Sequence, residues 1–204
     1  MRRISLTKTV FLLLFGFSAI VFSSFNALSQ QKTETSKNTS QTAPIQNNGQ
    51  HDFDFNFGTW KTQIKRLKNP LNNSGVWVEW SGTVVVSKVW DGRANLEELK
   101  IDETSGSGHI EGLTLRLFNP ESKQWSLNWS NSADGTLDKP LVGEFKNGCG
   151  VFINQGQFNG KSILVRHTYS NITQDSHHFE QAFSDDGGTT WETNWIANLT
   201  RIKQ

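Results

Sequence analysis

The sequence predicts an all-β domain that folds as a single antiparallel up-and-down barrel of about ten strands. Apolar and polar residues alternate along most of the chain after residue 57, which is the period of strands whose successive side chains face opposite ways. Turn signals rich in Gly, Asn, Asp and Pro recur at short intervals. Short connections favour antiparallel neighbours, because parallel strands need crossovers of about a dozen residues or more.

The first 29 residues are typical of a secretory signal peptide. Arg2, Arg3 and Lys8 precede an apolar run over residues 10–22, and small and polar residues follow it. The run is shorter than the roughly 20 residues that a membrane-spanning helix needs. No Cys lies near the expected cleavage site, which argues against a lipid anchor. We therefore expect a secreted or periplasmic protein with no membrane span after signal cleavage.

The rest of the chain divides into a linker and one domain. Residues 30–50 are mostly polar and cannot offset the entropy cost of ordering, so they predict a disordered linker. Residues 51–204 fit one barrel domain, and the single Cys149 allows no internal disulfide. The formal net charge of +1 gives no reason to expect a nucleic-acid partner. We expect a monomer.

The first element of the domain is a short helical turn over residues 51–57. Phe53, Phe55 and Phe57 recur there at every second position, and they are predicted to plug one end of the barrel. It is the only helical turn that the sequence favours.

Two hairpins test the barrel prediction through their pairing. A turn at residues 119–123 would set Leu117 opposite Trp125 and Leu113 opposite Trp129, all on one apolar face. A turn at residues 185–190 would pair further aromatic residues across two strands, Phe183 with Trp191 and Phe179 with Trp195.

The opposite face of the last strands would carry a polar row. In this register Arg166, Glu180 and Asn194 lie side by side, with Arg116 as a further candidate. If buried, these residues are the candidates for acid-base catalysis or for anchoring a polar ligand group. If exposed, Arg166 and Glu180 form an ordinary surface ion pair.

The apolar face contains the candidate ligand-binding residues, and they are rich in aromatic rings. Aromatic walls suit planar or acyl ligands, although small barrels also fill their interior with such side chains. The predicted ligand-binding set is Trp125, Trp129, His167, Tyr169, His177, Phe179 and Trp195.

The sequence Gly58-Thr59-Trp60 opens the barrel and Arg201 lies near its end. On these motifs the chain resembles the calycin superfamily, lipocalin-like barrels in which an Arg of the last strand packs over a Trp of the first. Residues 51–60, 111–120 and 180–188 more narrowly resemble a group of secreted bacterial proteins of unknown function. The resemblance implies a lipocalin- or nitrobindin-like barrel in which Gly58, Trp60 and Arg201 are structural closure residues.

Nitrobindin-like calycins bind haem through a His near the last strands, but residues 186–204 contain no His. His167 and His177 are the two imidazoles expected on the apolar face, and a haem or zinc site there stays an alternative. The sequence predicts no cofactor and no metal site.

Residues 184–191 match the Asp-box of sialidases and related propellers. The motif occurs once here, whereas propellers repeat it in each blade. We therefore expect a structural role, in which Asp186 caps a hairpin turn and Gly187 and Gly188 supply positive φ angles.

The leading hypothesis is a secreted barrel that binds a small apolar or aromatic ligand. One alternative is an acid-base enzyme of the isomerase or cyclase type. Another is an envelope interaction protein that binds no ligand. No nucleophile elbow, phosphate-binding loop or Cys-His pair favours a different enzyme class.

Overall fold

A computed structural model describes residues 48–72, 75–103 and 109–203, and they contain ten strands. The predicted signal peptide and residues 30–47 of the predicted linker lie outside the described residues. The elements are η1 (Asp54–Asn56), β1 (Gly58–Leu67), β2 (Trp77–Val89), η2 (Trp90–Gly92), β3 (Ala94–Glu103), β4 (Ile110–Asn119), β5 (Gln124–Asn131), β6 (Leu141–Lys146), β7 (Cys149–Phe158), β8 (Lys161–Ser170), β9 (Ser176–Ser184) and β10 (Glu192–Arg201).

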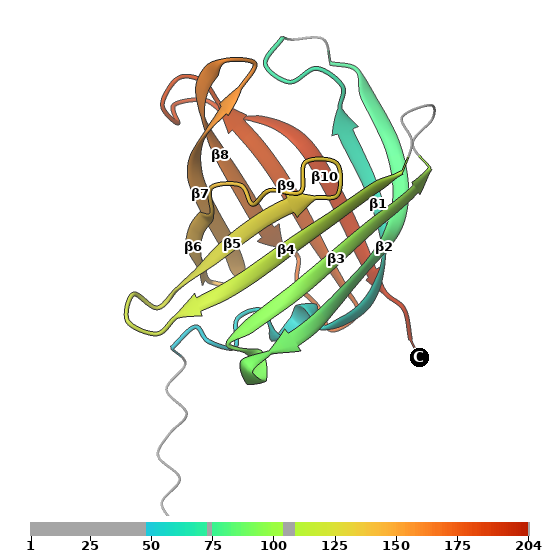
Figure 1. The fold of residues 1–204 in the computed structure, drawn as a ribbon, viewed down its shortest axis with the longest axis vertical. Helices are drawn as coiled ribbons and strands as arrows, with labels where there is room; N and C mark the ends of the chain where they lie inside the picture. Colours follow the sequence, from blue (N-terminus) through green and yellow to red (C-terminus); the bar gives the residue numbers. More distant parts are fainter. Residues whose placement is uncertain (1–47, 73–74, 104–108, 204) are drawn as a thin grey trace, which may run out of the picture. The chain divides into compact units, whose positions relative to one another are not determined.

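The strands form one closed barrel in which each strand pairs with its neighbours in the chain (Figure 1). β1 closes the barrel against β10 and pairs Trp60 with Arg201. All the pairs are antiparallel, so the predicted all-β up-and-down barrel is confirmed. No helix among the described residues is long and apolar enough to cross a lipid bilayer.

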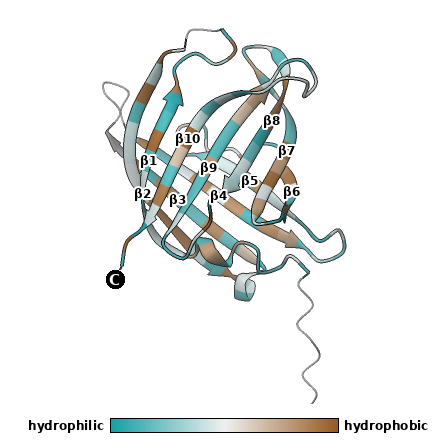
Figure 2. Cartoon of the chain, turned by 180° about the vertical axis from the view of Figure 1, so that it is seen from behind, coloured by the Kyte–Doolittle hydropathy of each residue, from teal (hydrophilic) through white to brown (hydrophobic). Residues whose placement is uncertain are grey.

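Hydrophobic and hydrophilic residues alternate along the strands (Figure 2). At one end of the barrel the chain before β1 forms the 3-10 turn η1, within the range predicted to be helical (Figure 1). Phe53 is 1% exposed, whereas Phe55 and Phe57 are half-buried. We call the end of the barrel that holds η1 and these Phe side chains the closed end.

The buried apolar residues form two clusters, one on each side of the barrel. One lies on β1, β2, β3 and β10 and contains Trp60, Ile64, Trp80, Val84, Val86, Leu99, Ile101, Ala197 and Leu199. The other surrounds Phe53 on the side formed by β4 to β8 and contains Phe53, Phe118, Trp125, Leu127, Leu141, Phe152 and Tyr169.

The predicted register of β4 and β5 is wrong by one residue. Phe118, not Leu117, lies opposite Trp125, and Thr114, not Leu113, lies opposite Trp129. A slip of one residue moves every side chain to the other face of a sheet. The inward positions of β4 are therefore Gly112, Thr114, Arg116 and Phe118, whereas the leucines between them face outward and are half-buried.

The predicted register of β9 and β10 is also wrong. Phe183 lies opposite Glu192, and Phe179 lies opposite Ala197. The register shifts again between Thr193 and Trp195, where β10 has a bulge. Bulges insert one residue and redirect its side chain, and this one could not be foreseen from the alternation alone.

The predicted role of Asp186 is confirmed, because its carboxylate organises the turn between β9 and β10. It accepts hydrogen bonds from the Ser184 hydroxyl at 2.7 Å and from the backbone N–H and hydroxyl of Thr190 at 3.0 and 2.7 Å. Gly187 and Gly188 have φ angles of 75° and 93°. These hydrogen bonds hold the pKa of Asp186 well below its usual value.

Candidate ligand-binding cavity

The barrel encloses a cavity of about 720 Å³ between the closed end and the opposite, open end. Aromatic and aliphatic side chains form most of its wall. The charged side chains that line it near the open end, which we call the rim, are Arg66, Glu111, Asp138 and Lys139, together with His109. Deeper in the barrel the only charged side chain of the described residues that lines the cavity is Glu97.

Six of the seven predicted ligand-binding residues line this cavity: Trp129, His167, Tyr169, His177, Phe179 and Trp195. Trp125 does not line it. Its side chain is 1% exposed, packs edge-on against Phe53 at 5.1 Å, and donates from Nε1 to the Gly49 carbonyl at 2.8 Å. Trp125 belongs to the packing of the closed end, so its placement in a ligand-contacting wall is wrong.

The predicted polar row of Arg166, Glu180 and Asn194 does not form. Arg166 lies opposite Ala182, and Glu180 lies opposite Thr168. Arg166 stacks 4.2 Å from the centroid of the Trp191 ring, and Glu180 pairs with His178 at 2.9 Å. Both strands present the residues on either side of these two to the cavity, so Arg166 and Glu180 face outward.

His178 is the partner that Glu180 uses instead. Partial burial lowers the pKa of His178, but hydrogen bonds with Asn198 and Glu180 outweigh that effect and raise it. The His178–Glu180 pair lies on the outer face of the barrel. The acid-base site predicted from Arg166, Glu180 and Asn194 is therefore not assembled in the cavity.

A buried ion pair lies at the inner end of the cavity. Nη2 of Arg116 donates to Oε2 of Glu97 at 2.5 Å, and the two side chains are 1% and 15% exposed. Arg116 also donates to Oδ1 of Asn95 at 3.0 Å and to the Tyr169 hydroxyl at 3.2 Å. Its guanidinium lies 5.0 Å from the Phe53 ring centroid, behind the wall that Glu97 lines.

The protonation states follow from this pairing. Burial opposes ionisation of Glu97, but the charge and hydrogen bond of Arg116 hold its pKa below the usual value. Burial also opposes the charge of Arg116, and Glu97 more than compensates. Burial raises the pKa of Tyr169. At neutral pH the inner end therefore holds a carboxylate, a guanidinium and a neutral phenol.

A directed chain of hydrogen bonds positions His167. Nδ2 of Asn194, at the β10 bulge, donates to the Glu192 carbonyl at 3.5 Å, so Oδ1 of Asn194 is left to accept from Nε2 of Gln181 at 2.9 Å. Because Nε2 of Gln181 is used as a donor to Asn194, Oε1 of Gln181 is the atom that lies 2.9 Å from Nε2 of His167. An amide oxygen can only accept, so Nε2 of His167 donates to it. The proton of neutral His167 is thus on Nε2, and Nδ1 is an acceptor.

His177 lies deeper, against the rings of Trp60 and Phe55 at 4.8 and 5.2 Å. Its side chain is 4% exposed, and its Nδ1 has no hydrogen-bond partner among the described residues. Burial lowers the pKa of both His167 and His177 to about 4, so both are neutral at pH 7. Within the described part of the chain, no three His, Cys, Asp or Glu side chains gather as a metal site would require.

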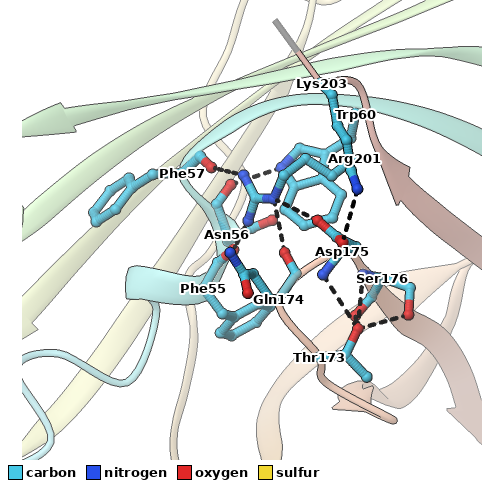
Figure 3. Close-up of polar contacts among 10 residues, drawn as sticks. All are labelled: Phe55, Asn56, Phe57, Trp60, Thr173, Gln174, Asp175, Ser176, Arg201 and Lys203. Carbon is cyan, nitrogen blue, oxygen red and sulfur yellow. Dashed lines mark hydrogen bonds and ion pairs between the residues drawn. The ribbon is translucent and has the colours of Figure 1, made fainter.

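The closed end is fastened by Arg201 (Figure 3). Its guanidinium donates to the carbonyls of Phe57, Phe55 and Gln174 at 2.6 to 2.7 Å and lies 4.0 Å from the Trp60 ring centroid. Trp60 is fully buried and donates from Nε1 to the Asn56 carbonyl at 2.8 Å. A Cβ at Gly58, whose φ is +109°, would lie 2.9 Å from Nη1 of Arg201.

Glu97 is a charged residue of the inner cavity that was not predicted from the sequence. The apolar leucines of β4 indicated the wrong inward face, and that error turned Arg116 and its partners outward. A signal was present: two polar residues, Asn95 and Glu97, alternate with Leu96 along β3, opposite Arg116 and Thr114. Matching opposite charges across two strands would have favoured the register that the structure has.

No protein-family model and no curated protein sequence matches the chain. Among solved structures, Rv2717c from M. tuberculosis superposes with a TM-score of 0.52 at 12% identity, over 79% of this chain and 99% of that one. The S-type phycobiliprotein lyase CPES from Guillardia theta gives a TM-score of 0.49 at 12% identity, over 74% and 91%. At 12% identity the likeness to Rv2717c is one of fold alone, and the fold of this chain is a closed barrel of ten strands.

Proposed function

We propose that this protein is a secreted or periplasmic carrier that binds a small, largely apolar or aromatic ligand inside the barrel. One observation carries the proposal: the lumen is not filled by its own side chains but retains about 720 Å³, in the range of roughly 300 to 1,000 Å³ of small-molecule sites. Trp129, Phe179 and Trp195 line it, and the Phe53 and Arg201 contacts seal the closed end.

The experiment is to express the full chain in a bacterium, purify the protein without denaturation, and record its native mass spectrum and its absorption spectrum. We expect a mass above that of the polypeptide, a retained small molecule, and removal of residues 1–29. A Soret band would favour the haem alternative. A protein of bare polypeptide mass would count against tight carriage.

A cavity-filling variant decides between an empty lumen and a ligand site. Ala197 lines the cavity and is 5% exposed. An Ala197→Phe substitution is expected to displace the ligand, whereas Thr200→Phe, in the same strand but on the exposed face, is the matched control. Loss of ligand from both variants, or from neither, would contradict binding in the lumen.

A further inference from the structure

The inner end of the cavity presents a carboxylate but no cation to a ligand. Glu97 lines the cavity, whereas Arg116 is 1% exposed and lies behind it. Nη1 of Arg116 donates to Asn95 and Nη2 donates to Glu97 and to Tyr169, whereas Nε is buried and has no partner among the described residues. An anionic group at this depth would meet Glu97 first, because the guanidinium of Arg116 is buried and does not line the cavity.

Glu97 retains capacity to accept hydrogen bonds. An ionised carboxylate has about four lone-pair sites. In the structure one oxygen accepts from Arg116 and the other accepts from the Thr114 hydroxyl at 3.3 Å. The carboxylate can therefore accept further hydrogen bonds from a molecule in the lumen, and Arg116 keeps it ionised.

His167 adds a second acceptor to the same cavity. The chain through Gln181 and Asn194 places its proton on Nε2, so Nδ1 accepts, and no described residue donates to it. The ring packs edge-on against Phe179 at 5.0 Å and is held in place. The inner cavity thus offers acceptors in excess, between aromatic walls.

We propose that the ligand is a neutral molecule with an aromatic body and a hydroxyl or N–H group at its inner end, which donates its proton to Glu97, with Nδ1 of His167 as a second acceptor in the same cavity. The proposal rests on the proposed carrier function and specifies its ligand class. A cation is less suitable, because Arg116 already balances the charge of Glu97, and an anion would meet the carboxylate of Glu97 at the cavity wall and not the buried guanidinium. The aromatic rings of Trp129 and Trp195 contact the body of the ligand.

The test uses three probes of the same ring system with the purified full chain at pH 7: 2-naphthol, 2-methoxynaphthalene and 2-naphthoate. Calorimetric titration measures the three dissociation constants. We expect 2-naphthol to bind about tenfold more tightly than the other two, since a hydrogen bond to a charged group contributes at least that factor. Equal affinities, or a preference for 2-naphthoate, would overturn the ligand class and leave the carrier function standing. If none of the three probes binds, the carrier function fails as well.

Variants locate the preference. In Glu97→Gln the advantage of 2-naphthol over 2-methoxynaphthalene should fall toward parity, with little change for the ether. Glu111→Gln removes a rim carboxylate that is about half exposed and is the matched control. Because Glu97→Gln disturbs a buried ion pair, His167→Phe supplies a second variant that removes an acceptor and leaves that pair intact. A preference that persists undiminished in both variants would overturn the proposal.

Discussion

Two ion pairs at opposite ends of the barrel differ in exposure. In the pair near the closed end, Glu97 is 15% and Arg116 is 1% exposed. In the pair toward the open end, Lys65 is 56% and Glu79 is 73% exposed. The buried pair adds hydrogen bonds to Asn95, Thr114 and Tyr169. The exposed pair has water as its main alternative partner. Breaking an ion pair is therefore expected to cost much stability at the closed end and little at the open end.

The arginines near the two ends of the barrel also differ in the number of their hydrogen bonds. Arg201 at the closed end stacks on Trp60 and donates to three carbonyls. The guanidinium of Arg66, near the open end, lies 5.3 Å from the Trp80 ring centroid. Its side chain makes no hydrogen bond to another described residue. Of these two arginines, the one at the closed end is therefore the more firmly held.

The largest contrast is expected from breaking the two ion pairs on their basic side. Arg116→Met leaves Glu97 buried without its charge partner and should lower the free energy of unfolding by about 3 to 5 kcal/mol. Lys65→Met should change it by less than about 1 kcal/mol. Urea unfolding of both variants measures the two values. Similar losses would mean that burial does not separate the pairs.

The second contrast is pH dependence. The unfolded chain protonates His177 below its ordinary pKa of 6.5, but the folded protein does so only near its lowered pKa of about 4. Stabilisation by neutral His177 is thus full above pH 6.5 and is lost as the pH falls toward 4, by ~3 kcal/mol. His177→Phe, which keeps an aromatic ring beside Trp60, should weaken that loss.

Unfolding by urea at pH 7, 5.5 and 4.5 measures the slope for wild type and variant. The rim variant His109→Phe removes an imidazole whose side chain is half exposed and is the control. An unchanged slope in His177→Phe would show that His177 is protonated in the folded protein as readily as in the unfolded one.

The third contrast concerns the arginines. Arg201→Lys keeps the positive charge but loses the planar fork that reaches three carbonyls, and it should cost about 2 kcal/mol of stability. Arg66→Lys should have a negligible effect. Thermal unfolding compares the two variants, and the midpoint should fall in Arg201→Lys alone. Equal midpoints would argue that the carbonyl contacts of Arg201 do not hold the closed end.

The last comparison is between Gly112, which lies beside the Trp129 ring, and Gly156, which lines the cavity. A Cβ at Gly112 would lie 2.1 Å from the Trp129 ring, so Gly112→Ala must displace that indole, at about 1 to 3 kcal/mol. At Gly156 the nearest atom, of Val165, would be 3.4 Å away, so Gly156→Ala fits. We expect weaker 2-naphthol binding only in the Gly112 variant. An unaltered affinity there would mean that Trp129 does not contact the probe.

The site was predictable only in part. His167 and His177 were placed correctly in the lumen, because an error of two residues between β8 and β9 keeps every side chain on its face. Arg116 was undervalued, because an error of one residue between β4 and β5 turned the predicted inward face of β4 outward. Trp125 was predicted on the inward face of β5, but it packs against Phe53 at the closed end and does not line the cavity. Asn194 was predicted to lie beside Glu180. In the structure the β10 bulge lies at Asn194, and its side chain accepts a hydrogen bond from Gln181 instead.

The sequence by itself determined the fold class, the positions of the turns and the alternation of each strand. These properties are local, because they depend on side-chain period and on the φ angles that Gly and Asn allow, as at Gly187. Only the tertiary structure decided which alternate set faces the lumen and which buried charges meet. Leu115 faces outward and Arg116 inward because Arg116 contacts Asn95 and Glu97 on the neighbouring strand β3 and Tyr169 on β8 across the barrel. A buried charge is stable only where such partners converge.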